Sequence, residues 1–273
     1  MPARLLHLSD LHTGTAEDPL VERAVAALID RVDPQLIVAS GDLTHRGRPD
    51  QHDRAAAFLK RLDRPLLAIP GNHDLPYTLP ARFTRPFREF ERQWMTTEPV
   101  FDSAELYVIG INSVRPWRHQ SGGVRSGQLE RAAALLREAP ARALRVVTLH
   151  HHLIGAPWRS RKKPVARRSH VLGCLVDAGA ELILAGHIHQ AAVAERHEFE
   201  VAPGSLRGAT VSIAPGLGQP RPDRRGEARG LHVYDAREQT LLVETYIWRD
   251  QDWGLTAVRR FPRGSEPLQV EPA

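Results

Sequence analysis

The chain is poor in cysteine and has no long apolar run. Cys174 is the only cysteine among 273 residues, so an internal disulfide is excluded, which suits a reducing compartment. No apolar stretch approaches the ~20 residues that a membrane-spanning helix needs. The first predicted strand begins near Arg4 and its motif follows by Asp10, which leaves no room for a signal peptide. We therefore expect a cytoplasmic protein with no membrane partner.

Lysine is also scarce. Lys60, Lys162 and Lys163 are the only lysines, and arginine supplies the rest of the 37 basic residues. The net charge is +5 and the isoelectric point is about 9.8. Because a guanidinium binds phosphate through two parallel hydrogen bonds, this composition is compatible with an anionic substrate. A genomic bias toward arginine codons explains the general excess equally well.

Five short apolar runs are each followed by residue types that bind metals. Residues 5–8 lead to Asp10 and His12, and residues 36–39 lead to Asp42. Residues 66–69 lead to Asn72, His73 and Asp74. Residues 146–149 lead to His150, His151 and His152, and residues 182–185 lead to His187 and His189. Continuous Val/Ile/Leu runs are typical of buried parallel strands, and open α/β sheets bind ligands beyond the carboxyl ends of their strands. Five strands in one sheet would bring these side chains to a single edge.

Amphipathic stretches lie between the apolar runs. We expect helices at residues 20–29, 55–62, 129–136 and 171–177. The motifs at Asp10, Asp42 and Asn72 are separated by about 30 residues each, the length of a βαβ unit. The pattern therefore predicts strand ends that all face one way.

The remaining chain divides into a covering segment and a strand-rich C-terminal part. Residues 75–100 are irregular and rich in aromatic residues, arginine and proline, and we expect them to cover the site. From about residue 195, strand-like runs are separated by proline and glycine, which predicts strands that form part of a second sheet. We predict one domain over residues 1–262 and a frayed tail over 263–273.

The candidate ligands combine oxygen and nitrogen donors. Asp10 and Asp42 carry carboxylates, Asn72 a carbonyl oxygen, and the histidines imidazole nitrogens. This mixture suits Mn, Fe or Zn better than an all-oxygen calcium site or a thiolate zinc site. Ligands that share one carboxylate can hold two ions about 3.5–4 Å apart, and such ions lower the pKa of bound water from 15.7 to about 7. Hydroxide is then available at neutral pH.

In this order and spacing the motifs resemble those of the calcineurin-like metallophosphoesterases. The pattern of that superfamily is D-x-H, G-D, G-N-H-[DE], H and G-H-x-H, and here it stands as Asp10-x-His12, Gly41-Asp42, Gly71-Asn72-His73-Asp74, His150 and Gly186-His187-x-His189. The set is closest to the class III cyclic-nucleotide phosphodiesterase branch. The resemblance implies an α/β fold: a four-layer sandwich of two mixed β-sheets flanked by helices.

The resemblance also implies how two divalent ions divide the ligands. Asp10, His12, Asp42 and His189 would hold one ion, and Asp42, Asn72, His150 and His187 would hold the other, with Asp42 as the bridge. The family usually has His-His-Pro where this chain has three histidines in a row. We expect His150 to be the ligand because it directly follows the apolar run.

Two residues of the G-N-H-D motif are not ligands in that scheme. His73 would be catalytic, either donating to the phosphate or protonating the leaving oxygen, and Asp74 would orient its ring. Asn72 and His73 are also expected to contact the substrate.

A basic segment follows the metal-binding histidines, with six basic residues between Arg159 and Arg168. We expect Arg161 and Lys162 to bind substrate phosphate, and an aromatic in the same segment, Trp158, is placed to stack a base. A solvated basic loop fits the composition equally well. Two further residues stay open: His45 as a substrate contact or a surface-loop histidine, and Trp117 as a pocket-lining or a core residue.

These observations predict a phosphodiesterase that uses two divalent ions (Mn, Fe or Zn) and attack by metal-bound hydroxide, with 3′,5′-cyclic nucleotides as the first substrate class. One alternative is a Mn-dependent nuclease on single-stranded DNA or RNA, which the basic segment and the isoelectric point favour. A second is a non-catalytic protein that binds a nucleotide or a partner. The expected partner is thus a small phosphodiester or nucleotide, with nucleic acid as the alternative, and the sequence does not indicate an oligomeric state.

Overall fold

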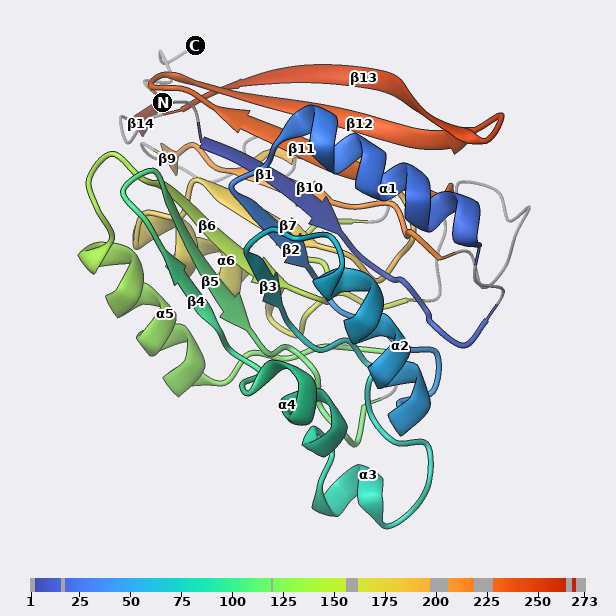
Figure 1. Ribbon diagram of the computed structural model, residues 1–273. Coiled ribbons are helices and arrows are strands. Elements are labelled where there is room, and N and C mark those ends of the chain that lie inside the picture. The colour runs from blue at the N-terminus through green and yellow to red at the C-terminus, as the bar shows by residue number, and fades with distance from the viewer. Residues whose placement is uncertain are drawn as a thin grey trace.

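Two six-stranded β-sheets stacked face to face form the centre of the molecule in a computed structural model (Figure 1). The structure describes residues 3–15, 18–118, 120–155, 162–196, 206–218, 228–263 and 267–268. The strand order is β13-β12-β11-β1-β2-β3 in one sheet and β4-β5-β6-β7-β10-β8 in the other.

The first sheet combines N-terminal and C-terminal strands. Its members are β1 (Ala3–Leu8), β2 (Leu36–Ala39), β3 (Leu66–Ala68), β11 (Gly230–Ala236), β12 (Thr240–Arg249) and β13 (Asp252–Pro262). The first three are parallel to one another, while β11 pairs antiparallel with β1 and begins an antiparallel series that continues through β12 and β13. This sheet is therefore mixed.

The second sheet is mixed in the same way. It contains β4 (Val100–Asp102), β5 (Leu106–Ile111), β6 (Leu144–Leu149), β7 (Leu182–Ala185), β8 (Ala192–Glu195) and β10 (Thr210–Ile213). Strands β5, β6, β7 and β10 are parallel, and the edge strands β4 and β8 are antiparallel to their neighbours. Two further short strands, β9 (Leu206–Arg207) and β14 (Pro267–Leu268), pair with each other.

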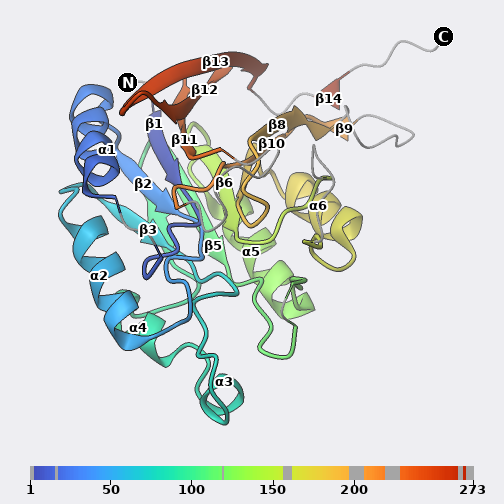
Figure 2. The same cartoon turned by 90° about the vertical axis from the view of Figure 1, so that its right-hand side faces the viewer.

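Helices cover the outer face of each sheet, as Figure 2 shows. The six helices of the described residues are α1 (Pro19–Val32), α2 (Pro49–Lys60), α3 (Ala81–Thr84), α4 (Arg88–Trp94), α5 (Ser126–Glu138) and α6 (Arg168–Asp177). Helix α1 illustrates why they form: Asp18 caps its start by accepting from the Leu20 amide at 3.0 Å, and Val21, Val25 and Leu28 form its buried stripe. Helices α1 and α2 pack on the first sheet, and α5 and α6 pack on the second.

The core lies in three apolar layers. Residues of both sheets, such as Leu36 of β2 and Val146 of β6, fill the space between the sheets. Alternate residues of the same strands, such as Ile37 and Val147, face the helices instead. The order helix, sheet, sheet, helix confirms the predicted four-layer sandwich, and the continuous apolar runs follow from strands that are buried on both faces.

Two details of the predicted arrangement are wrong. The five motif strands do not share one sheet, because β1, β2 and β3 lie in the first sheet whereas β6 and β7 lie in the second. The C-terminal strands also divide: β8 and β10 join the second sheet, but β11, β12 and β13 extend the first. Buried strands of both sheets carry the same apolar pattern, so the pattern does not reveal which sheet a strand joins.

The covering segment and the C-terminal tail both contain secondary structure. The covering segment at 75–100 contains the short helices α3 and α4. In the tail that was expected to be frayed, Arg263 forms a 3.1 Å ion pair with Glu181 and Pro267–Leu268 forms β14, while residues 264–266 and 269–273 lie outside the described residues. Residues 197–205, near the start of the strand-like C-terminal part, also lie outside them. Within the described part of the chain, no helix combines the length and apolarity that crossing a bilayer requires.

Candidate metal centre

The loops that follow five strands converge at one end of the sandwich. The loop after β1 carries Asp10 and His12, the loop after β2 carries Asp42, the loop after β3 carries Asn72, the loop after β6 carries His150, and the loop after β7 carries His187 and His189. All seven side chains are buried, with at most 5% of their surface exposed. Because the parallel strands of both sheets end on the same side, the site spans the two sheets.

Tight backbone geometry brings these loops together. Asp10, His12, Asp42, His187 and His189 all have positive φ angles, between 49° and 75°, a conformation that few non-glycine residues adopt. The motif glycines permit close approach: a Cβ at Gly71 would overlap the Asp42 amide, and one at Gly186 would overlap the Ser9 hydroxyl. Five of the eleven non-glycine residues with positive φ in the described part of the chain are thus candidate ligands.

The side chains form two compact sets. Asp10, His12 and His189 make one, and Asp42, His150 and His187 make the other; within each set the potential ligand atoms lie within 4.8 Å of one another. Asp42 lies between the sets, because its Oδ2 atom is 3.3 Å from His150 Nε2 and 3.8 Å from His12 Nε2.

The two aspartates each present to the site one oxygen that lies close to imidazole nitrogens but accepts no hydrogen bond. Asp10 Oδ2 accepts from the Ser9 hydroxyl at 2.7 Å and from the His187 amide at 2.9 Å, whereas its Oδ1 atom has no hydrogen-bond donor. Asp42 Oδ1 accepts from the His73 amide at 2.8 Å, and its Oδ2 atom is likewise buried without a donor. Burying a carboxylate oxygen unpaired is costly, and a cation at this position would remove that cost. The residues therefore fit divalent metals.

Hydrogen bonds select which imidazole nitrogen faces the site. His150 donates from Nδ1 to the Ser40 carbonyl at 2.8 Å, which leaves Nε2 to face Asp42 and Asn72. His187 donates from Nε2 to the Gln120 carbonyl at 3.2 Å. Its Nδ1 atom therefore faces the site, 3.2 Å from His150 Nε2. Metal-binding histidines are usually held in this way through their other nitrogen.

The charges of the site also suit cations. Burial by itself would raise the pKa of Asp42, but the adjacent His150 and His73 hold that pKa well below its usual value. Burial by itself would lower the pKa of His150, yet the carboxylate of Asp42 raises it to about 9. Burial lowers the pKa of His12 and His187 well below the usual value. The ionised carboxylates and the neutral rings of His12 and His187 are the forms that bind metal ions, whereas His150 must lose a proton when an ion binds.

Residues 3–191 match the sequence profile of the calcineurin-like phosphoesterases, whose members are metal-dependent hydrolases. The chain belongs to this family. It is 30% identical over 179 residues to a probable cyclic nucleotide phosphodiesterase of Synechococcus, and 30% identical over 180 residues to the 3′,5′-cyclic adenosine monophosphate phosphodiesterase CpdA of Haemophilus influenzae. The two alignments cover 63% and 61% of this chain but only 65% and 58% of those relatives.

The fold is shared with more distant proteins. A dimetal phosphatase from Danio rerio superposes over 96% of this chain and 99% of its own length, with a TM-score of 0.65 and 14% sequence identity. At this sequence identity the likeness shows a shared fold.

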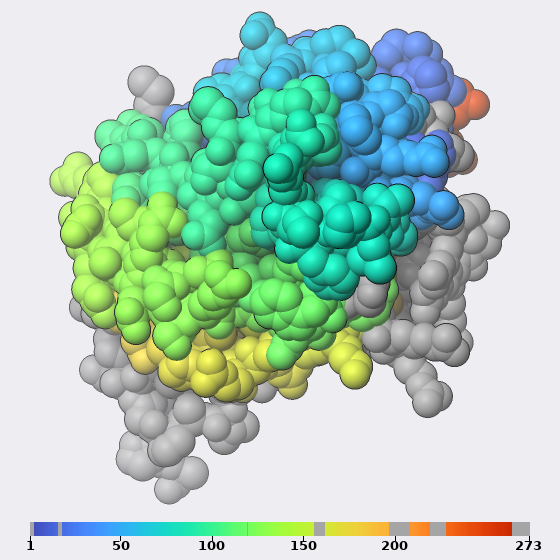
Figure 3. All heavy atoms as spheres, turned by 90° about the horizontal axis from the view of Figure 1, so that it is seen from below, coloured from blue at the N-terminus to red at the C-terminus, as the bar shows by residue number. Residues whose placement is uncertain are grey.

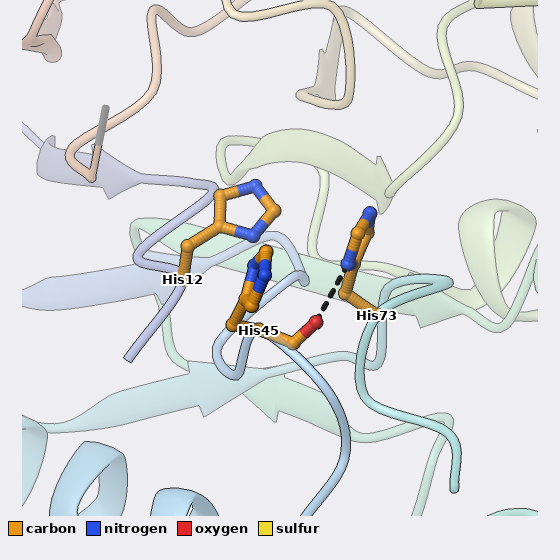
Figure 4. Close-up of side chains that lie close together, drawn as sticks. All are labelled: His12, His45 and His73. Carbon is orange, nitrogen blue, oxygen red and sulfur yellow. Dashed lines mark hydrogen bonds between the residues drawn. The ribbon is translucent and has the colours of Figure 1, made fainter. Parts of the chain in front are cut away.

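The third histidine cluster of this calcineurin-like chain was not expected as such. The rings of His45 and His73 are stacked with centroids 5.6 Å apart, and the centroids of His12 and His73 are 4.8 Å apart (Figure 4). One ring nitrogen of each of the three histidines lies within 4.8 Å of the other two. This set shares His12 with the set that contains Asp10. An imidazole that binds two ions must lose both ring protons, so the two sets compete for His12.

The predicted role of Asp74 differs from its contacts. The ring of His73 is oriented by the His45 carbonyl, to which Nδ1 donates at 2.8 Å. Asp74 instead accepts from the amides of Gly71 and Thr44, both at 2.8 Å, and from that of Leu43 at 3.2 Å. Its carboxylate joins the loops after β2 and β3, and burial raises its pKa. A backbone carbonyl acceptor leaves no pattern in the sequence, which is why His45 was not expected to orient the ring.

The remaining predicted site residues lie around the centre. Lys162 is half-buried and its ammonium donates to the His187 carbonyl, whereas Arg161 and Trp158 lie outside the described residues. Of the three consecutive histidines, His150 is the one in the set with Asp42. Trp117 is 61% exposed, so it is not a core residue.

Proposed function

We propose that this calcineurin-like protein is a phosphodiesterase that uses two divalent metal ions to hydrolyse 3′,5′-cyclic nucleotides. The observation that carries the proposal is the position of Asp42, whose unpaired Oδ2 atom lies between the two ligand sets. The names of the Synechococcus and Haemophilus relatives support the substrate class.

The ligands would divide as the resemblance implies. Asp10, His12, Asp42 and His189 would hold one ion, and Asp42, Asn72, His150 and His187 would hold the other. The oxygen and nitrogen donors support Mn, Fe or Zn. When bound, such ions neutralise phosphate charge and make a hydroxide nucleophile available near neutral pH.

His73 supplies the proton chemistry. Its Nδ1 donates to the His45 carbonyl, so the neutral ring carries its proton there and its Nε2 atom can only accept. Only the imidazolium form can donate from Nε2 to the phosphate or the leaving oxygen. His73 thus serves as a general acid in its charged form, and the His45 carbonyl keeps the ring in the orientation that this requires.

The proposal is tested by counting metals and measuring hydrolysis. Chelator-treated protein is reloaded with Mn²⁺, Fe²⁺ or Zn²⁺ separately, then analysed for metal content and assayed on cyclic AMP and bis-p-nitrophenyl phosphate. We expect two ions per chain and hydrolysis of both diesters. At most one tightly bound ion, or no turnover of either diester with any metal, would contradict the proposal.

The net charge of +5 favours single-stranded nucleic acid as a second candidate substrate. Each phosphate contact to a polymer releases counterions, so binding of an oligonucleotide weakens steeply with salt. A cyclic mononucleotide shows little such dependence. Turnover of cyclic AMP and of a single-stranded oligonucleotide at two salt concentrations therefore separates the two activities.

A further inference from the structure

Two exposed aromatic residues lie in loops that Arg82 joins, and one of them, Tyr77, contacts His73. Tyr77 follows the G-N-H-D motif and is 52% exposed, and Trp117 lies in the loop after β5 and is 61% exposed. Figure 3 shows the segment that contains Tyr77, in turquoise, on the lower face of the molecule beside the green residues that follow β5. An aromatic side chain that is exposed beside a polar site can stack against a base.

Tyr77 is in direct contact with the proposed general acid. Its hydroxyl lies 3.1 Å from Nδ1 of His73, and the centroids of the two rings are 6.1 Å apart. A diester whose phosphate contacts His73 would therefore place its neighbouring groups within reach of the Tyr77 ring.

A buried arginine holds this aromatic residue in place. Arg82 is only 4% exposed, and its guanidinium carbon lies 6.0 Å from the Tyr77 ring centroid. The same guanidinium donates to the Pro116 carbonyl at 2.9 Å and to the Pro76 carbonyl at 3.4 Å. Arg82 thus joins the residue that precedes Tyr77 to the residue that precedes Trp117. Fixing a side chain before a ligand arrives reduces the entropy that binding must cost.

We propose that the exposed part of the Tyr77 ring is the surface on which the nucleobase of the substrate stacks. This inference rests on the proposed function and adds the determinant that distinguishes nucleotides from other phosphodiesters. Every base has a π-face, so a single aromatic residue accepts purines and pyrimidines alike. Arg82 approaches the ring from within the protein, and the exposed part remains available to the base.

The first experiment compares substrates with and without a base. Wild-type protein and the variants Tyr77→Ala, Tyr77→Phe and Phe83→Ala are loaded with Mn²⁺ and assayed on cyclic AMP and on glycerophosphoethanolamine, a diester that lacks an aromatic group. Tyr77→Ala should raise the KM for cyclic AMP about tenfold, which corresponds to about 1.4 kcal/mol, and change the KM for glycerophosphoethanolamine less than about twofold.

The other two variants separate the effect of the Tyr77 ring from that of its hydroxyl and from that of removing any exposed aromatic residue. Tyr77→Phe keeps the ring, so its KM for cyclic AMP should stay near the wild-type value even if kcat changes through His73. Phe83 of α3 is also an exposed aromatic, 56% exposed, and Phe83→Ala should leave both KM values unchanged. Equal effects of Tyr77→Ala on both substrates, or an effect of Phe83→Ala as large as that of Tyr77→Ala, would overturn the inference.

A binding measurement decides the inference independently of turnover. Calorimetry of AMP and of inorganic phosphate with the Mn²⁺-loaded protein should show about tenfold weaker AMP binding for Tyr77→Ala and unchanged phosphate binding. Unchanged AMP binding would refute stacking on Tyr77, whereas the proposed function would stand if both diesters were still hydrolysed. If the wild-type protein hydrolysed neither diester, the proposed function would be contradicted. The AMP binding measurement would then still decide whether a base stacks on Tyr77.

Discussion

Asp42 uses its two carboxylate oxygens for different purposes. Oδ1 accepts from the His73 amide and fixes the loop, while Oδ2 is buried and unpaired between the two ligand sets. The same division is seen in Asp10. One oxygen of each residue thus maintains the fold, and the other is available to a cation.

The variant Asp42→Asn tests this division. The amide keeps the size of the side chain and can still accept from the His73 amide, but it removes the charge that both ions would share. Because charge neutralisation by metals contributes several kcal/mol to the transition state, we expect turnover to fall by ~10³-fold or more. Metal analysis should find at most one ion per chain. Asp50→Asn, at a carboxylate whose side chain is 64% exposed, is the matched control and should keep both ions.

His73 can be tested by the leaving group. The variant His73→Ala should retain both metals, because His73 belongs to neither of the sets that contain Asp10 and Asp42. Turnover of cyclic AMP, which has a poor leaving group, should fall by about 10²–10⁴-fold, the usual contribution of a general acid. Turnover of bis-p-nitrophenyl phosphate, which needs no protonation, should fall much less. Equal losses on both substrates would exclude the general-acid role.

At the scale of elements, Asp74 connects the loop after β2 to the loop after β3. It accepts from three backbone amides and from the Thr44 hydroxyl at 3.0 Å. Leaving a buried donor unpaired costs about 1–3 kcal/mol. We therefore expect Asp74→Ala to lower the free energy of unfolding in urea by ~3 kcal/mol or more.

A smaller change in the same contact provides the comparison for Asp74. The variant Thr44→Val removes a hydroxyl that also accepts from the Gly47 amide and contacts the His73 carbonyl, both at 3.0 Å, but it leaves the three amides paired with Asp74. Its loss of unfolding free energy should therefore be smaller than that of Asp74→Ala. If Asp74→Ala unfolded at the wild-type urea concentration but shifted the pH profile of turnover, Asp74 would act on the His73 ring as first expected.

The sequence predicted the positions of the strands better than the paths of the loops. The apolar runs predicted β1, β2, β6 and β7 because strands buried on both faces must be apolar throughout. The candidate ligands were predicted because each lies within a few residues of the end of such a run, and the structure brings them together. The division into two sheets depends on pairing between distant segments, and the positions of His45 and Tyr77 depend on the paths of loops. Neither property is encoded by a local pattern.

At the scale of the whole molecule, a buried polar network joins the sheets behind the candidate metal centre. His7 of β1 contacts the Ser40 hydroxyl at 2.7 Å, and the Tyr234 hydroxyl of β11 donates to Ser212 of β10 at 2.7 Å. His232 of β11 lies 3.0 Å from the same Ser212 hydroxyl. Burial lowers the pKa of His7 and of His232 to about 3, so both rings are neutral in the folded protein.

The network predicts sensitivity to acid. The unfolded protein protonates His232 near its ordinary pKa of about 6.5, whereas the folded protein does not do so until about pH 3. The contribution of the neutral ring to stability is therefore complete above pH 6.5 and is lost as the pH falls from 6.5 toward 3, at ~1.4 kcal/mol per pH unit.

Urea unfolding of wild-type protein and of His232→Asn at pH 7 and pH 5 measures this effect. Between these pH values the wild type should lose about 2 kcal/mol more unfolding free energy than the variant, which lacks the titrating group. The control is His170→Asn on α6, which removes an exposed histidine. Its unfolding free energy should depend on pH in the same way as that of the wild type. Identical pH dependence of wild type and His232→Asn would show that His232 does not titrate as described.

Each of the two main ligand sets takes members from both sheets: Asp10 and Asp42 follow strands of the first, and His189 and His150 follow strands of the second. The apolar interior between the sheets, where Leu36 faces the second sheet and Val146 the first, consequently sets the width of the gap that the ions must fill. Because protein interiors are close-packed and transmit small volume changes, a change in the size of these interior aliphatic residues would alter the distance between the two halves of each candidate ligand set while leaving every candidate ligand unchanged.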